Sequence, residues 1–231
     1  MPIQPNPDHK KILTDIYEAL YGHFGPQQWW PGESPFEIAV GAILTQNTNW
    51  TNVEKAIRHL KAGKVLTAES LHTMSHPRLA SLIKPAGYFN VKAKRLKNFI
   101  AFLTNHYKGS MNRLGKSDMN VLRAELLSVN GIGPETADSI LLYALDKPVF
   151  VIDAYTKRIL SRHSIVSEKI TYHELQDLFH KNINPDVPHY NEYHALLVML
   201  GKDYCRPKPL CSGCPLQNMG TGRKSERIAA I

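Results

Sequence analysis

A four-residue turn places the strongest constraint on how this chain can fold. Residues 126–145, LLSVNGIGPETADSILLYAL, set Gly-Ile-Gly-Pro between two apolar helical runs. Gly131 and Gly133 can take positive φ angles, which lets the backbone reverse within very few residues. Ile132 is expected to plug the angle between the helices, and Pro134 suits the first position of the second helix. The sequence therefore predicts a helical hairpin whose turn presents backbone N–H groups and a helix N-terminus, an arrangement that suits a phosphate.

Most of the remaining sequence reads as helices joined by short turns that contain glycine or proline. Capping residues are expected at Ser34, Asn90 and Thr171, the last in a capping box with Glu174. Another apolar helix, within residues 191–205, is expected to close at Gly201. Only residues 147–153, KPVFVID, have strand character, and that segment is short and isolated. An all-α protein follows.

The charge of the chain favours a polyanionic partner. Its 28 Lys and Arg residues against 20 Asp and Glu residues give a net charge of +8. Charge alone is weak evidence, because many basic proteins never meet nucleic acid. The longest apolar run, near residues 38–44, is far too short to cross a bilayer, so no membrane partner is expected. The first residues lack the apolar core of a secretory signal, so we expect an intracellular protein.

Several separate motifs occur in an order that resembles the endonuclease III superfamily of DNA glycosylases. The segment LLSVNGIGPETADSILLYALDKPVFVIDAYTKRILSRHSI is similar to the helix-hairpin-helix, the Gly/Pro-rich loop and the aspartate of that family. The likeness extends back through FEIAVGAILTQNTNW and IKPAGYFNVKAKRL and forward to CRPKPLCSGC, and so covers roughly residues 30–215. It implies double-stranded DNA as partner, a monomer, and a nuclear location or a cytoplasmic one with the nucleoid.

The same resemblance implies a two-lobed, all-α fold. A six-helix bundle that carries the hairpin is expected over residues 33–146. A second helical domain is expected from residues 1–32 and 147–231, with the cysteine loop near its end. The DNA groove is expected between the two lobes.

Asp153 follows VFVI and precedes AYTKRIL, so it is expected at a helix N-terminus, where an N-cap role is one interpretation. By resemblance it is the catalytic carboxylate of the family. Breaking a base–sugar bond builds oxocarbenium-like charge on the deoxyribose, which an ionised carboxylate stabilises.

Bifunctional members of the family carry a lysine two residues after the second hairpin glycine, and its amine forms a Schiff base with the sugar. This chain has Glu135 at that position. A carboxylate cannot form an imine, so we expect hydrolysis without lyase activity. An ordinary acid of the first helical turn is the other interpretation of Glu135.

The three tryptophans lie in polar segments flanked by Gly, Pro or Asn, namely Trp29 and Trp30 in WWPGESPF and Trp50 in QNTNW. Indoles that fill a helical core are the commoner case. The pattern is similar to the 3-methyladenine glycosylase III branch, in which aromatic residues stack on the flipped base. An N-alkylated purine is cationic, so electron-rich indoles attract it, and it is already a good leaving group. A mismatch adenine glycosylase would instead need a glutamate where Ala42 stands, to protonate a neutral purine.

Extruding a base leaves a gap that other side chains fill. The resemblance assigns this wedge role to Gln46 and Tyr88, and plain loop residues are the alternative interpretation. Contacts to the DNA backbone are predicted from Gly131, Gly133, Lys92 and Lys94. A solvated helix face would give the same pattern of lysines.

All three cysteines lie in one Cys-x5-Cys-x2-Cys stretch, at Cys205, Cys211 and Cys214. Such clustering in a reducing compartment suggests a metal or cluster site rather than disulfides. The stretch is close to the [4Fe-4S] loop of the family, in which a fourth cysteine stands where this chain has Gly220. Because such clusters normally take four thiolates, an incomplete cluster with an outside ligand, a smaller cluster and no cluster all stay open. A bound cluster would be structural.

The leading hypothesis is a monofunctional DNA glycosylase that removes alkylated purines, such as 3-methyladenine, in base-excision repair. One alternative is an endonuclease III-like oxidised-pyrimidine glycosylase with lyase activity. Another is a non-catalytic helix-hairpin-helix DNA-binding protein.

Overall fold

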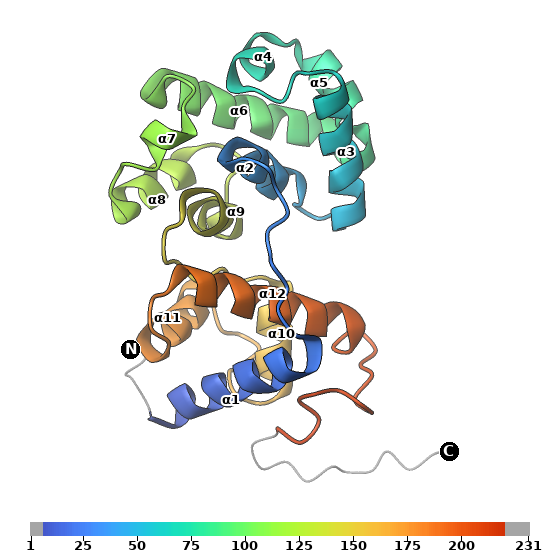
Figure 1. Ribbon diagram of the computed structural model, residues 1–231, viewed down its shortest axis with the longest axis vertical. Coiled ribbons are helices and arrows are strands. Elements are labelled where there is room, and N and C mark those ends of the chain that lie inside the picture. Colours follow the sequence, from blue (N-terminus) through green and yellow to red (C-terminus); the bar gives the residue numbers. More distant parts are fainter. Residues whose placement is uncertain (1–6, 220–231) are drawn as a thin grey trace. The chain divides into compact units, whose positions relative to one another are not determined.

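The computed structural model describes residues 7–219, and the chain divides into two compact units (Figure 1). Unit 2 is the continuous stretch Trp30–Val149, and unit 1 combines Met1–Trp29 with Phe150–Ile231. Every regular element among the described residues is a helix, so the predicted all-α class is confirmed. The predicted bundle limits, residues 33 and 146, each lie three residues inside the limits of unit 2.

Unit 2 is built around two helices that each contact several others. Its elements are α2 (Pro35–Leu44), α3 (Trp50–Ala62), α4 (Ala68–Thr73), α5 (His76–Leu82), the short 3₁₀ helix η1 (Lys84–Ala86), α6 (Phe89–Tyr107), α7 (Met111–Leu114), α8 (Met119–Ser128), α9 (Pro134–Ser139) and its π-helical continuation η2 (Ile140–Ala144). Helix α6 packs against α4 and α5 on one side and α2 on the other (Figure 1). Helix α2 also packs against η2, α3 and α9, and is therefore apolar on most sides.

Unit 1 contains α1 (Pro7–Phe24), α10 (Ala154–Arg162), α11 (Tyr172–Asn182) and α12 (Val187–Asp203). Helix α12 packs against both α1 and α10. Its fully buried Tyr193 donates a hydrogen bond of 2.7 Å to the carbonyl oxygen of Leu13, which ties α12 to α1. Phe150 stacks on Phe179 of α11 with ring centroids 3.7 Å apart. The interior of this unit is thus rich in aromatic side chains.

Two capping predictions are confirmed and one is wrong. The hydroxyl of Ser34 accepts from the amide of Glu37, and Thr171 forms its capping box with Glu174. Asn90, in contrast, lies inside α6, which begins at Phe89. The cap is Tyr88, in a left-handed conformation.

The expected end of α12 also needs correction, because of a tertiary contact. Gly201 does not end α12, which continues to Asp203. A Cβ at Gly201 would lie 2.3 Å from Cδ1 of Tyr155, so the glycine permits close packing of α10 on α12. Residues 147–153 are extended but pair with no strand in the described chain, because side chains of α11 bind their backbone. His180 Nε2 accepts from the amide of Phe150 at 2.9 Å.

Candidate functional site

The hairpin turn of unit 2 has the predicted form at three of its four residues. Gly131 has φ +98°, and a Cβ there would lie 2.3 Å from Cγ of Arg95, so both the backbone and the space require glycine. Ile132 is 5% exposed, as a plug between two helices should be. Pro134 opens α9. Gly133 differs from the prediction, because its φ of −93° and ψ of 177° are ordinary extended backbone.

Gln46 is hydrogen bonded to this turn. Its Nε2 donates to the carbonyl oxygen of Gly131 at 3.1 Å and to the hydroxyl of Thr136 at 2.9 Å. Its Oε1 accepts from a guanidinium nitrogen of Arg95. The loop after α2 and the hairpin are therefore joined through one side-chain amide. Sequence reasoning grouped Arg95 with the cationic residues of this helix that are expected to contact the DNA backbone. It did not indicate the bond to Gln46, because nothing in a cationic helix face distinguishes Arg95 from its neighbours.

Tyr88 projects from the turn between η1 and α6. Its side chain is 72% exposed, and its backbone has φ +45° and ψ 32°. Positive φ is uncommon outside glycine and costs conformational energy. Strained backbone positions of this kind occur most often at functional sites, so the exposed Tyr88 ring is a candidate for a functional role.

The two lysines predicted to contact DNA differ sharply in position. Lys94 is exposed on α6. Lys92 is only 1% exposed, and its ammonium donates to the carbonyl oxygens of Leu44 at 2.9 Å and Ala86 at 2.6 Å. Lys92 therefore does not belong with the predicted surface contacts, because its charge is held inside unit 2.

Trp30 and Trp50 meet in unit 2, edge to face, with ring centroids 5.0 Å apart and ring planes at 82°. Tyr143, on η2, contacts Trp30 with ring centroids also 5.0 Å apart. Both indoles are half-buried, so they are neither sealed in the core nor free in solvent. Tyr143 escaped sequence reasoning because it lies within a long apolar run. We name Trp30, Trp50 and Tyr143 the aromatic cluster.

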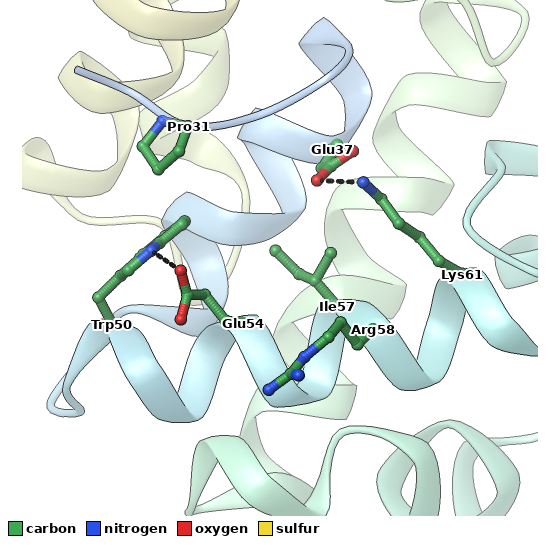
Figure 2. A pocket seen from close by; sticks show the side chains of 7 residues that line it. All are labelled: Pro31, Glu37, Trp50, Glu54, Ile57, Arg58 and Lys61. Carbon is green, nitrogen blue, oxygen red and sulfur yellow. Dashed lines mark hydrogen bonds and ion pairs between the residues drawn. The ribbon is translucent and has the colours of Figure 1, made fainter. Parts of the chain in front are cut away.

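A pocket of about 360 Å³ opens beside Trp50 (Figure 2). The Nε1 of Trp50 donates to Oε1 of Glu54, one turn further along α3, at 2.8 Å. Glu37 and Lys61 form an ion pair of 2.9 Å at the other end of the pocket. The pocket is lined by Pro31, Glu37, Trp50, Glu54, Ile57, Arg58 and Lys61. Its wall thus combines an indole with charged groups of both signs.

Trp29 belongs to unit 1, although its sequence neighbour Trp30 belongs to unit 2. The Lys202 ammonium lies 5.4 Å from the centroid of the Trp29 ring, within the range of a cation–π contact. The sequence pair WWP therefore supplies one indole to each unit.

Asp153 is the N-cap of α10 in unit 1. Its Oδ1 accepts from the amide of Thr156 at 2.7 Å and from the Thr156 hydroxyl at 2.8 Å. Its Oδ2 lies 3.8 Å from Nε2 of His194, and the carboxyl side chain is 11% exposed. The cap fixes the orientation of the carboxylate, so the N-cap and catalytic interpretations are compatible.

His194, on α12, is a second polar residue at this carboxylate that sequence reasoning missed. Burial lowers the pKa of His194 below its ordinary value, and the nearby Asp153 opposes that shift. The imidazole is therefore neutral at neutral pH. A lone histidine in an apolar helix gives little sequence signal, since a core histidine looks the same.

The residues at the two diagnostic positions have the expected character. Glu135 is exposed in the first turn of α9. Ala42 is buried within α2, at 6% exposure. Neither an amine at position 135 nor an acid at position 42 is therefore available for chemistry.

The cysteine loop after α12 is held by arginines of α10. Arg158 Nε donates to the carbonyl oxygen of Cys205 at 2.7 Å. Arg162 donates to the carbonyl oxygens of Arg206 and Pro207 at 2.5 and 3.0 Å, and lies 3.4 Å from the Cys205 sulfur. These bonds fasten the loop to α10, the helix that Asp153 caps.

The described residues supply three thiols to the cysteine loop. Cys205 and Cys214 are buried, Cys211 is exposed, and no group of three metal-ligating side chains gathers anywhere in residues 7–219. Burial raises the pKa of the Cys214 thiol above its ordinary value. Gly220, where the family pattern has its fourth cysteine, lies outside the described residues.

Comparison with known proteins identifies the family to which the chain belongs. Residues 40–185 match the model of the HhH-GPD superfamily of base excision DNA repair proteins. A protein of Methanocaldococcus jannaschii, provisionally named as a DNA repair glycosylase, is 49% identical over 209 residues, which are 90% of this chain and 94% of that protein. Endonuclease III of Thermotoga maritima is 29% identical over 80% of this chain and 81% of its own length. The chain belongs to the HhH-GPD superfamily, and within it this protein is a DNA glycosylase of base excision repair.

Solved structures agree on the fold. The crystal structure of Helicobacter pylori 3-methyladenine DNA glycosylase bound to 1,N6-ethenoadenine has a TM-score of 0.72 and 28% identity, and covers 84% of this chain and 97% of that one. An endonuclease III–DNA complex has a TM-score of 0.78 at 20% identity, over 92% of this chain and 95% of that one, and supports the fold alone. Of the helices in the described part of the chain, none is both long and apolar enough to cross a membrane.

Proposed function

We propose that this protein is a monofunctional DNA glycosylase that hydrolyses the N-glycosidic bond of alkylated purines in double-stranded DNA. The observation that carries the proposal is the aromatic cluster in unit 2, in which the two indole rings are half-buried and Tyr143 is buried. An N-alkylated purine is cationic, and electron-rich ring faces attract cations. The carboxylate of Glu54, bonded to the Trp50 indole N–H, adds negative charge beside that ring. Trp29 supplies a further indole from unit 1.

Asp153 is the proposed catalytic residue. As the bond to a cationic base breaks, positive charge builds on the deoxyribose, and an ionised carboxylate stabilises it. The two bonds from Thr156 hold the Asp153 carboxylate in one orientation, which reduces the reorganisation needed during the reaction. The alkylated base leaves readily, so the mechanism needs no strong acid to protonate it. Ala42 is consistent with that requirement.

The reaction stops at the abasic site because position 135 holds a carboxylate. A lyase of this family type needs an amine there to form a Schiff base with the sugar. Glu135 cannot supply that bond, so water is the nucleophile.

DNA is proposed to be held as a duplex by a monomer of this chain. The hairpin from Gly131 to Gly133 and the exposed Lys94 contact the backbone. Gln46 and Tyr88 enter the duplex where the damaged nucleotide leaves it. The 72% exposure of Tyr88 supports this role. The likeness to the H. pylori 3-methyladenine enzyme, at 28% identity over 97% of that chain, supports the substrate class.

Release of bases from methylated DNA tests this proposal. The full chain is incubated with methylated duplex DNA, and free bases are separated by chromatography. We expect 3-methyladenine or a related alkylated purine to be released, and Asp153→Asn to lower the single-turnover rate by roughly 10²-fold or more. Asparagine is an equally good N-cap, so the variant keeps the fold of α10. Asp186→Asn is the matched control, because Asp186 caps α12 in the same unit.

The two alternative functions give different results. If borohydride traps a covalent adduct with DNA, the protein forms a Schiff base and the hydrolytic assignment fails. If no base of any kind is released while duplex binding persists, the protein is a binding module. Release of oxidised pyrimidines in place of alkylated purines would reject the proposed substrate class.

A further inference from the structure

Lys92 is the one lysine in the described chain that is fully buried, and the bonds of its ammonium reach two segments. Its Nζ donates to the carbonyl oxygens of Leu44 and Ala86, at 2.9 and 2.6 Å. Its backbone amide donates to the carbonyl oxygen of Tyr88 at 3.0 Å, which is the ordinary helical bond and does not depend on the side chain. A lysine on a cationic helix would ordinarily reach solvent, so this arrangement calls for a cause.

The two carbonyl groups identify the segments that Lys92 joins. Leu44 ends α2, two residues before Gln46, and Ala86 ends η1, two residues before Tyr88. The last carbonyls of a helix have no intrahelical partner, and a cation near them is favoured by the helix dipole. One ammonium therefore bridges the two stretches that carry the proposed wedge side chains.

Burying the charged Lys92 ammonium between these carbonyl groups has a free-energy cost. Burial and the neighbouring charge of Arg95 lower the pKa of Lys92 to about 8. An apolar side chain of the same length would fill the space without that penalty. Even the neutral amine keeps two N–H groups, so both carbonyls stay satisfied when the proton is lost.

Arg95, one turn further along α6, strengthens the same assembly. It donates to Oε1 of Gln46, whose Nε2 binds Gly131 and Thr136. The Gln46 segment is thus held at its backbone by Lys92 and at its side chain by Arg95. The Tyr88 segment is held by the Lys92 ammonium at one point, the carbonyl oxygen of Ala86.

We propose that Lys92 is a positioning residue that keeps the Gln46 and Tyr88 segments at a fixed spacing, so that both side chains enter the duplex together. This role rests on the proposed function through the wedge assignments of those two residues. It does not depend on which damaged base is released. Lys92 itself touches neither DNA nor the reacting atoms.

Lys97 provides a matched control on the same helix. Its Nζ donates to the carbonyl oxygens of Leu71, His72 and Met74, at 3.0, 2.5 and 2.8 Å. It thus closes the end of α4 with the same chemistry that Lys92 uses at α2. No wedge residue lies in that turn, so Lys97→Met removes a comparable set of bonds without disturbing the proposed assembly.

The experiment measures insertion into DNA apart from chemistry. The full-length wild type, Lys92→Met and Lys97→Met are bound to an undamaged duplex and to one that carries a stable abasic-site analogue beside a fluorescent purine. The ratio of the two affinities reports recognition of the gap, and the fluorescence reports unstacking. We expect Lys92→Met to lower the affinity ratio about tenfold and to remove most of the fluorescence change. The affinity ratio of Lys97→Met should stay within about twofold of the wild-type ratio.

A double-mutant cycle with Tyr88→Ala shows whether Lys92 acts through the wedge. If it does, Tyr88→Ala lowers the affinity ratio strongly in the wild type and little in the Lys92→Met background. In the Lys97→Met background, Tyr88→Ala should lower the affinity ratio by the same factor as in the wild type. Additive losses in both backgrounds would reduce Lys92 to a general stabilising residue and overturn the proposal.

The remaining outcomes separate this inference from the proposed function. If the wild type releases alkylated purines but Lys92→Met and Lys97→Met behave alike, the inference fails and the function stands. If the wild type recognises the gap but releases no alkylated purine, the function fails and the cycle still decides the inference. Should Lys92→Met not fold, Lys92→Gln takes its place in the cycle with Tyr88→Ala, and additive losses in that background would overturn the proposal.

Discussion

His194 links the ionisation of a single buried residue to the stability of unit 1. Because burial lowers its pKa below 6.5, the unfolded chain takes up a proton on His194 before the folded chain does. The neutral imidazole therefore contributes fully to the stability of the folded protein above pH 6.5, and this contribution is lost as the pH falls below 6.5. We expect the stability advantage of wild type over His194→Gln to shrink as the pH falls from about 7 to about 5. Urea unfolding at each pH measures this difference.

A control variant isolates this effect of His194. His173→Gln replaces an exposed histidine on α11 in the same unit. Urea unfolding of this variant over the same pH range gives the reference against which His194→Gln is compared. If His194→Gln keeps a constant difference, His194 does not gain a proton on unfolding, and the linkage to burial is wrong.

At the scale of elements, the sequence predicted those helix ends that local chemistry determines. Ser34 and Thr171 cap their helices with side-chain oxygens a few residues away, so a short motif suffices. The start of α6 depends instead on Tyr88, which caps the helix in a left-handed backbone conformation and without a side-chain hydrogen bond. No capping motif in the local sequence indicates a helix start of that kind. Asp153 was predictable from its flanks, whereas His194 comes from another helix.

The hairpin offers a paired test at this scale. Gly131→Ala places a Cβ 2.3 Å from Cγ of Arg95 at φ +98°, so we expect it to destabilise the protein by about 1–3 kcal/mol. It should also weaken duplex binding, since Arg95 holds Gln46. Gly133→Ala meets no atom within 4 Å at φ −93° and should change stability by less than about 0.5 kcal/mol. Urea unfolding and fluorescence anisotropy measure the two effects, and equal losses would contradict this account.

At the scale of the whole molecule, the proposed chemistry is divided between the two units. Unit 1 supplies Asp153 and Trp29, and unit 2 supplies the hairpin, the wedge residues and the aromatic cluster. The chain passes between units after Trp29 and again after Val149. The family resemblance predicted two domains, with residues 33–146 as one of them. It did not indicate that the pair Trp29 and Trp30 would be split, because adjacent residues in a polar segment give no sign of a boundary.

The net charge of +8 also acts at this scale, through the release of counterions from DNA. Affinity for undamaged duplex should fall linearly with salt concentration on logarithmic axes, with a slope set by the number of phosphates contacted. Lys94→Gln should reduce that slope by about one, because Lys94 is exposed and proposed to contact a phosphate. Lys11→Gln should leave it unchanged, because Lys11 already pairs with Asp15 at 2.6 Å on α1. Anisotropy titrations at several salt concentrations measure the slopes, and an equal reduction in both variants would show that total charge, rather than the face of α6, governs binding.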